Sequence, residues 1–266
     1  MEGPITRLFN VKNKKAKKIA WVHNDISKVF GNTFKAKLKK QFDEKVYTKY
    51  DRIIFVSNEN MENFKNTYPH ITHDKMQVIY NYLDKDAVIQ KSQQAIQTSF
   101  NQEDFNLLTV ARLVPQKAIE RFIKVHSKLI QNGVKHKVYI IGDGPEKENL
   151  EQLILQEKVQ DTFILLGKKE NPYPYIKQCD VLALLSYFEG YGMVLEEAKI
   201  LDKQVIITNT AATEALKNYA KARIVENNEQ AIYEGLEKII NKQDTEIKET
   251  TNYTNESILG EIKEVI

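Results

Sequence analysis

Short apolar runs and longer amphipathic stretches alternate along the second half of the chain. FNLLTVAR (105–112) and HKVYIIG (136–142) have the length and composition of buried strands. Between them, residues 115–133 place apolar side chains at helical spacing, with Pro115 near the first turn and Gly133 just past the end. The same alternation continues toward residue 208, and it predicts a parallel sheet with helices on both faces.

The first part of the chain shows a shorter version of this pattern. KIAWVHND (18–25), DRIIFVSNE (51–59) and DKMQVIYNYL (74–83) are predicted strands, with an amphipathic helix after the first. A polar, Gln-rich stretch at about 85–104 then separates this unit from the next, and its composition is typical of a linker. The pattern therefore predicts two α/β units.

Composition limits the class of protein. The 42% hydrophobic content of the 266 residues is enough for a core. The only cysteine, Cys179, falls in an apolar run, so we expect a buried structural thiol and a reducing compartment. No stretch has the ~18 consecutive apolar residues of a membrane span, and the N-terminus lacks the apolar core of a signal peptide. These features predict a cytoplasmic location.

The positive charge gathers at the front of the chain. Residues 1–50 hold thirteen Lys or Arg and four Asp or Glu, a balance of +9 against +3 for the whole chain. Within 28–50, apolar residues near helical spacing alternate with lysines: Val29, Phe30, Phe34, Leu38, Phe42, Val46 and Tyr50. Such a helix either packs on the core with a solvated lysine face or lies on an anionic membrane surface. Without a reader motif beside the lysines, we expect no nucleic-acid partner.

Two glutamates stand where an apolar strand is followed by a helix. In SYFEGYGMVLEEA (186–198) these are Glu189 and Glu197. In open α/β sheets, ligands bind in the crevice at the carboxyl ends of the strands, and the next helix offers free N–H groups to an anion. Since a carboxylate cannot neutralise a phosphate, we expect the glutamates to bind hydroxyl groups or hold neighbours in place. Sugars and riboses are rich in hydroxyl groups.

Basic side chains and glycine turns follow three other predicted strands. Arg112 and Lys117 follow the first strand of the second unit, a Gly-Asp-Gly-Pro turn (142–145) follows the second, and Gly167 and Lys168 follow the third. Taken singly, these features are typical of solvated surface and of turns before helices. Gathered at one sheet edge with the two glutamates, they favour a diphosphate site.

Several segments together resemble one known family. Glu189 and Glu197, with seven residues between them, resemble the E-x7-E motif of the retaining glycosyltransferase family 4, which has the two-domain GT-B fold. ARLVPQK resembles the family's G-R-L-x-x-x-K segment, IIGDGPEKENLE its G-D-G-P turn and helix, and VIYNYLD its strand leading to an Asn. KIAWVHND is similar to the W-x-H-N segment of bacterial members that build surface polysaccharides. Ala111 for the usual Gly and Val194 for the usual Pro are mild departures.

The resemblance implies a fold and a domain plan. The expected fold class is α/β and GT-B-like, with two Rossmann-type parallel-sheet domains, the first incomplete. Residues 1–90 would form a partial acceptor-side domain and residues 91–266 the nucleotide-sugar-binding domain, with the final helix packing back on the first domain. Family members normally begin with more strands and a Gly-rich loop, so we expect a truncated N-terminal domain with an exposed strand edge, or a partner that supplies the missing half.

The resemblance also implies roles for individual residues. Arg112 and Lys117 would contact the diphosphate of a nucleotide-sugar donor and stabilise charge on the leaving nucleotide. Glu189 would approach the hydroxyls of the donor sugar, and Glu197 would hold those of the ribose. Backbone N–H groups near Gly190 would meet the phosphates. The donor-binding set is Arg112, Lys117, Gly167, Lys168, Glu189, Gly190, Tyr191, Gly192 and Glu197.

His23 completes the expected catalytic set of Glu189, Arg112, Lys117 and His23. It matches a histidine that faces sugar and acceptor, and a structural histidine hydrogen-bonded near Asp25 is an equal alternative. No DxD-like pair follows a strand, so we expect no metal and no other cofactor. The mechanism implied by the resemblance is front-face transfer with retention, in which a donor phosphate oxygen takes the acceptor proton.

Three functions are therefore open. The first is a glycosyltransferase of the hexosyltransferase type, which moves a sugar from a nucleotide sugar to a polysaccharide or lipid-linked acceptor, with peripheral contact at the inner membrane face through the basic region. The second is a non-catalytic nucleotide-sugar-binding remnant or partner subunit without a complete acceptor domain. The third is a nucleotide-binding α/β protein unrelated to sugars.

Overall fold

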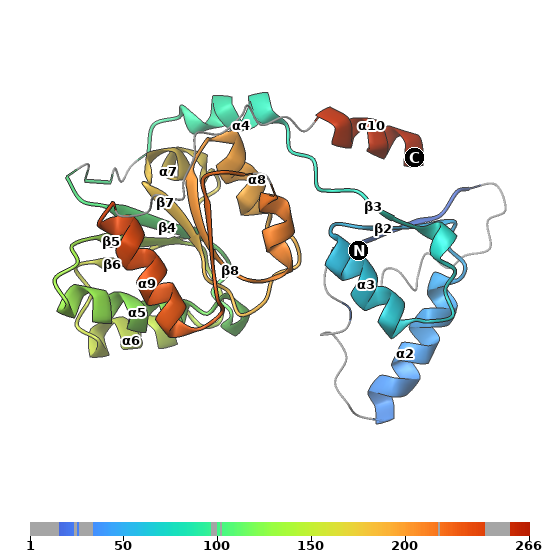
Figure 1. The fold of residues 1–266 in the computed structure, drawn as a ribbon, viewed down its shortest axis with the longest axis horizontal. Coiled ribbons are helices and arrows are strands. Elements are labelled where there is room, and N and C mark those ends of the chain that lie inside the picture. Colours follow the sequence, from blue (N-terminus) through green and yellow to red (C-terminus); the bar gives the residue numbers. More distant parts are fainter. Residues whose placement is uncertain are drawn as a thin grey trace. The chain divides into compact units, whose positions relative to one another are not determined.

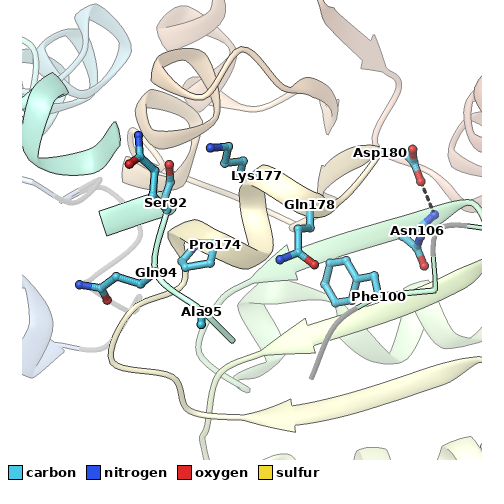
Figure 2. Close-up of a pocket in the computed structure, with 10 residues that line it drawn as sticks. Ser92, Gln94, Ala95, Phe100, Asn106, Pro174, Lys177, Gln178 and Asp180 are labelled. Atoms are coloured by element: carbon cyan, nitrogen blue, oxygen red, sulfur yellow. Dashed lines mark hydrogen bonds between the residues drawn. The ribbon is translucent and has the colours of Figure 1, made fainter. Parts of the chain in front are cut away.

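The chain folds into two compact units in the computed structural model (Figure 1). The first comprises residues up to Tyr82 with Glu189–Gly192 and Thr254–Ile266, and the second comprises Leu83–Phe188 and Met193–Tyr253. The structure describes residues 16–23, 26, 34–96, 100–101, 103–217, 219–242 and 256–266, with only the backbone of residues 34–37. Asp25, Val29 and Phe30, named in the sequence predictions, lie outside this part, as does the side chain of Phe34.

The first unit is built on a three-stranded parallel sheet. Its strands are β1 (Ile19–Val22), β2 (Arg52–Phe55) and β3 (Met76–Val78), in the order β1-β2-β3. Its helices are α2 (Phe34–Tyr47), α3 (Asn58–Thr67), the short 3-10 helix η2 (His73–Lys75) and α10 (Glu256–Val265).

Alternation along the central strand gives this sheet two buried faces. Ile53 and Phe55 of β2 belong to one apolar cluster with Tyr47 of α2 and residues of α3. Ile54, which lies between them, belongs to a separate cluster with Ile258 of α10. The last helix of the chain therefore packs on the sheet face opposite α2 and α3.

The second unit holds a six-stranded, all-parallel sheet. Its strands are β4 (Asn106–Val110), β5 (Lys137–Ile141), β6 (Phe163–Gly167), β7 (Val181–Leu184), β8 (Gln204–Thr208) and β9 (Ala222–Val225), in the order β6-β5-β4-β7-β8-β9. Its helices are α4 (Lys85–Ser92), η3 (Pro115–Lys117), α5 (Ile119–Gln131), α6 (Lys147–Gln156), α7 (Tyr173–Gln178), α8 (Met193–Ile200), η4 (Ala211–Leu216) and α9 (Glu229–Ile240).

Helices cover both faces of this sheet, as its apolar strands require. In Figure 1, α5, α6 and α9 lie on one face and α4, α7 and α8 on the other. The strand residues that the sequence pattern selected are buried; Leu107, Val181 and Ile206 are each fully inaccessible to solvent. The predicted α/β fold class with parallel sheets is confirmed.

Two local expectations from the sequence differ from the structure. Residues 85–92, predicted as part of a linker, form helix α4, because the Asp84 carboxylate caps it by accepting from the Ala87 N–H at 3.0 Å and Val88 is buried. Cys179 lies at the end of α7, not within a strand. Its thiol is buried, as expected, and burial raises its pKa to about 12.

None of the helices in the described part of the chain combines the length and the apolar character needed to cross a bilayer.

Candidate functional site

The order of strands in the second unit defines a point where a ligand crevice is expected. From β4 the chain proceeds outward through β5 and β6, then returns to β7 beside β4 and proceeds the other way through β8 and β9. Ligands of such sheets bind at the carboxyl ends of the two strands where the order reverses. The segment with Arg112 follows β4, and the segment with Glu189 follows β7. The sequence-predicted motifs thus follow the two strands of the switch point.

The Gly-Asp-Gly-Pro turn supports the backbone around Arg112. The Leu113 N–H donates to the carbonyl of Asp143 at 2.9 Å, and the Glu146 N–H donates to the carbonyl of Leu113 at 3.1 Å. A Cβ atom on Gly144 would lie 2.3 Å from that Leu113 oxygen. Glycine is therefore needed here because two backbones approach closely, and the turn fixes the loop after β4.

Three predicted cations lie at the carboxyl ends of β4 and β6. Arg112 is exposed, and its guanidinium makes no hydrogen bond or ion pair with another described residue. Lys117 ends η3 and is half-buried, and Ala118 after it turns the chain into α5 through a left-handed backbone conformation (φ 52°). Lys168 is exposed just after Gly167, whose φ is +69°. An unpaired arginine beside a parallel-sheet edge is suited to bind a phosphate.

Glu197 is a half-buried carboxylic acid on α8 without a hydrogen-bond partner among the described residues. Burial raises its pKa to about 7. Burial also raises the pKa of the Tyr173 hydroxyl, and the nearby Glu197 charge raises it further, so the two groups are neighbours. The adjacent Glu196 instead pairs with Lys199 at 2.7 Å. Glu197 is thus free to accept hydrogen bonds from the hydroxyls of a ligand.

The residues Glu189–Gly192 make their contacts within the first unit. A Cβ atom on Gly190 would lie 2.8 Å from the carbonyl oxygen of His23, so glycine permits the close approach of these two backbones. The rings of Tyr191 and Tyr80 stack with centroids 5.8 Å apart. Glu189 itself is 6% exposed. The backbones of His23 and Gly190 thus lie side by side.

The His23 side chain is exposed at the end of β1. Its ring lies parallel to that of Trp21, with centroids 6.4 Å apart and an interplanar angle of 16°. The alternative of a structural histidine bonded near Asp25 falls outside the described residues. The contact with Gly190 is made by the backbone of His23, and its ring is exposed.

Side chains that the sequence did not indicate hold the loop after β7. Four successive carbonyls each accept a hydrogen bond from a different side chain: Leu185 from Arg121 (2.6 Å), Ser186 from Thr208 (2.7 Å), Tyr187 from Asn227 (2.8 Å) and Phe188 from Gln116 (2.9 Å). Their sequence separations of 64, 22, 40 and 72 residues explain why no local motif revealed them. The loop is therefore fixed up to the residue before Glu189.

These features define the chain as a Rossmann-type α/β protein with a cationic and carboxylate-bearing edge at its switch point. The model of the family Glycosyl transferases group 1 matches residues 90–257, so the chain belongs to this family. The match covers every strand of the six-stranded sheet.

Two similar curated proteins are bacterial glycosyltransferases. The chain is 28% identical over 212 residues to an N-acetylgalactosamine-N,N'-diacetylbacillosaminyl-diphospho-undecaprenol 4-alpha-N-acetylgalactosaminyltransferase of Campylobacter jejuni, which covers 79% of this chain and 56% of the relative. It is 29% identical over 164 residues to the O-antigen biosynthesis glycosyltransferase WclY of Escherichia coli, or 60% of this chain and 44% of that protein. The chain thus spans about half the length of these relatives.

Solved structures support the fold. TarM of S. aureus superimposes with a TM-score of 0.75 at 18% identity, over 97% of this chain and 52% of that one. HepE of Anabaena, in complex with UDP and glucose, superimposes with a TM-score of 0.74 at 17% identity, over 92% and 70%. The GT-B-like fold class predicted from the sequence is confirmed.

Proposed function

We propose that this chain binds a nucleotide sugar and transfers the sugar, with retention of configuration, to a polysaccharide or lipid-linked acceptor. The observation that carries the proposal is the position of the two motif segments directly after β4 and β7, the strands that flank the switch point. The complex of HepE with UDP and glucose, and the acceptor named for the Campylobacter jejuni relative, support the substrate classes.

The proposed chemistry needs charge stabilisation more than a protein base. The bond between the sugar C1 and the diphosphate oxygen breaks while C1 bonds to the acceptor oxygen on the same face. Arg112 and Lys117 stabilise the negative charge that the diphosphate gains, in place of a metal. A phosphate oxygen takes the acceptor proton. Glu189 orients the donor sugar, and Glu197 accepts hydrogen bonds from the ribose hydroxyls.

His23 has the remaining role in this proposal. At the carboxyl end of β1 and against Gly190, it contacts the donor sugar or the acceptor. Gly167, Lys168, Tyr191 and Gly192 complete the donor site. We expect the reaction to need neither a metal nor another cofactor.

A second candidate function is donor binding without transfer, with a partner that supplies the rest of the acceptor side. The first sheet favours it, since the described residues give that unit three strands against six in the second. Both candidates share the donor site and differ only in turnover.

Turnover separates the two candidates. We would incubate the chain with UDP-glucose, UDP-N-acetylglucosamine and GDP-mannose, with EDTA and separately with Mg²⁺, and follow release of the nucleotide and the anomeric proton of the sugar by NMR. Release of sugar with its α configuration kept, equal in EDTA and Mg²⁺, supports the retaining transferase. Binding without release supports the second candidate, and an inverted product contradicts the proposed mechanism.

We also propose that α2 contacts an anionic membrane surface. Leu38 and Phe42, one helical turn apart, are 54% and 55% exposed, whereas Val46 is buried. The exposed Lys45 follows Phe42 on the same face. Because apolar and basic side chains share an exposed stripe, the helix suits the boundary of a negatively charged bilayer.

Vesicle binding tests this contact. The chain should co-sediment with vesicles that contain phosphatidylglycerol and much less with pure phosphatidylcholine. A Leu38→Ser/Phe42→Ser variant should bind the anionic vesicles at least about fivefold more weakly, from lost apolar burial. Leu155→Ser, on α6 and 64% exposed, is the matched control. Equal binding by all three proteins would contradict the proposal.

A further inference from the structure

The loop of residues 185–188 is held by side chains, not by sheet or helix hydrogen bonds. Its four carbonyls and the donors Gln116, Arg121, Thr208 and Asn227 are here called the carbonyl clamp. The donors come from four separate segments, since Gln116 lies in η3, Arg121 in α5, Thr208 in β8 and Asn227 in the loop before α9. A loop without helix or sheet hydrogen bonds is held in one conformation when each of its carbonyls accepts from a different side chain.

Arg121 is the most deeply buried charged member of the clamp. Its side chain is 4% exposed and donates to the Leu185 carbonyl at 2.6 Å. Its guanidinium carbon lies 4.4 Å from the ring centroid of Tyr187. The Tyr187 hydroxyl in turn donates to Glu120 at 2.8 Å. The ring, the guanidinium and the carboxylate together fix the side of the loop that faces α5.

Gln116 connects the loop to the segment that follows β4. Its backbone carbonyl accepts from the Tyr187 N–H at 3.0 Å, and its side-chain amide donates to the Phe188 carbonyl at 2.9 Å. Gln116 thus accepts a hydrogen bond from one loop residue and donates a hydrogen bond to the next. It stands directly before Lys117, and the loop ends directly before Glu189.

We propose that Gln116 and Arg121 are positioning residues that fix the loop of residues 185–188, which leads to the sugar-binding Glu189, against the diphosphate-binding segment that follows β4. The segment with Arg112 and Lys117 and the loop that leads to Glu189 are joined by the clamp, so a shift of one moves the other. The ligand part of this inference rests on the proposed function. The mechanical part, that Gln116 holds the loop, does not.

The mechanical part is tested without any ligand. Gln116→Glu keeps the shape of the side chain but replaces the donor amide by a carboxylate that faces the Phe188 carbonyl. Amide hydrogen exchange of peptides within 185–192 should become about fivefold faster, from loss of roughly one hydrogen bond. Gln131→Glu, the same change at the far end of α5, should leave these peptides unchanged. Unchanged exchange in Gln116→Glu would overturn the inference.

The ligand part is tested with UDP and UDP-glucose by calorimetry. Gln116→Met, which removes the donor amide without adding a charge beside Lys117, and Arg121→Lys should keep the affinity of the parent for UDP within about twofold and lose about fivefold or more of the affinity for UDP-glucose. A purely structural role would instead lower both affinities and the melting temperature together, and that result would overturn the inference. If the parent binds neither compound, the proposed function fails, while the exchange experiment still decides whether Gln116 holds the loop.

Discussion

At the scale of single residues, Glu197 has the most unusual environment of the predicted donor-site residues. Its carboxyl group is half-buried and has no hydrogen-bond partner among the described residues. Burial disfavours the charged form and raises the pKa from 4.5 to about 7. Hydroxyl groups of a ribose would supply the missing donors. The isolated acid is thus a cost to folding that a ligand relieves.

The sign of this cost gives a prediction. Because the folded pKa is raised, burial of Glu197 costs no stability below pH 4.5, where the group is protonated in both states. The stability is lost as the pH rises from 4.5 through 7, where the unfolded chain ionises more readily. Glu197→Gln should therefore be more stable than the parent at pH 8, on the order of 2 kcal/mol, and equal to it at pH 4. Urea unfolding at both pH values measures the difference.

The neighbouring glutamate provides the control. Glu196→Gln removes a buried partner of Lys199 and should destabilise the protein at pH 8. If Glu197→Gln raises the free energy of unfolding by the same amount at pH 4 and pH 8, the Glu197 carboxyl is not buried as described.

A second residue-scale prediction concerns two histidines of the second unit. The His126 and His136 rings are hydrogen-bonded at 2.8 Å, and His126 also bonds Thr162 at 2.9 Å. Burial lowers the pKa of His126 to about 3 and that of His136 to about 4, so both rings are neutral. Stability should fall as the pH drops from 6.5 toward 4, since the unfolded rings take up protons first.

Ring NMR signals test the histidine pair directly. Neither His126 nor His136 should titrate between pH 8 and pH 5, because burial lowers the pKa of both rings below this range. A midpoint near 6.5 for either buried ring would refute this assignment to the core.

At the scale of elements, the glycine turn after β5 shows how one loop supports another. The Gly144→Ala variant would place a methyl group 2.3 Å from the Leu113 carbonyl oxygen and displace the segment of Arg112. We expect a loss of about 1–3 kcal/mol in stability, from forced overpacking, together with weaker nucleotide binding. Gly260→Ala, where the added carbon meets nothing within 4 Å, should cost little. Thermal unfolding of both variants checks the pair, and equal melting temperatures would contradict the steric argument.

The elements also show where sequence patterns suffice. The buried parallel strands were predicted well. A short run of apolar residues such as NLLTV in β4 is stable only when both faces of the strand are covered by other elements. Helix α4 was missed because its Gln- and Lys-rich sequence has little amphipathic pattern, and its packing against α7 and α8 supplies the stability instead. The apolar stripe of α2 was predicted as one face, yet Leu38 and Phe42 are exposed while Val46 and Tyr50 are buried.

At the scale of the whole molecule, the sequence indicated the site through residues that follow strands. The segment with Arg112 and Lys117 and the loop that leads to Glu189 could be assigned to one sheet edge because they follow β4 and β7, which are parallel neighbours. The clamp residue Arg121 could not be found in this way. Its partner Leu185 is 64 residues away, and only the folded sheet brings them together. Contacts between segments far apart in the chain are therefore less visible in the sequence than charged residues that directly follow a strand.

In our proposal, the edge at the switch point of the six-stranded sheet binds a nucleoside diphosphate through Arg112, Lys117 and Glu197. The most direct measurement is calorimetric titration of the chain with UDP, GDP and ADP without added metal. We expect the parent to bind one of the three. Arg112→Ala/Lys117→Ala should abolish most of that affinity, and Glu197→Ala should weaken it by about 1–3 kcal/mol through unpaired ribose hydroxyls.

A charge-matched variant makes the result specific. Lys124→Ala/Lys135→Ala removes the same charge from two exposed lysines on and just after α5 and should bind like the parent. If the parent binds no nucleotide, or if Arg112→Ala/Lys117→Ala binds as tightly as the charge-matched control, this edge of the sheet is not a nucleotide site.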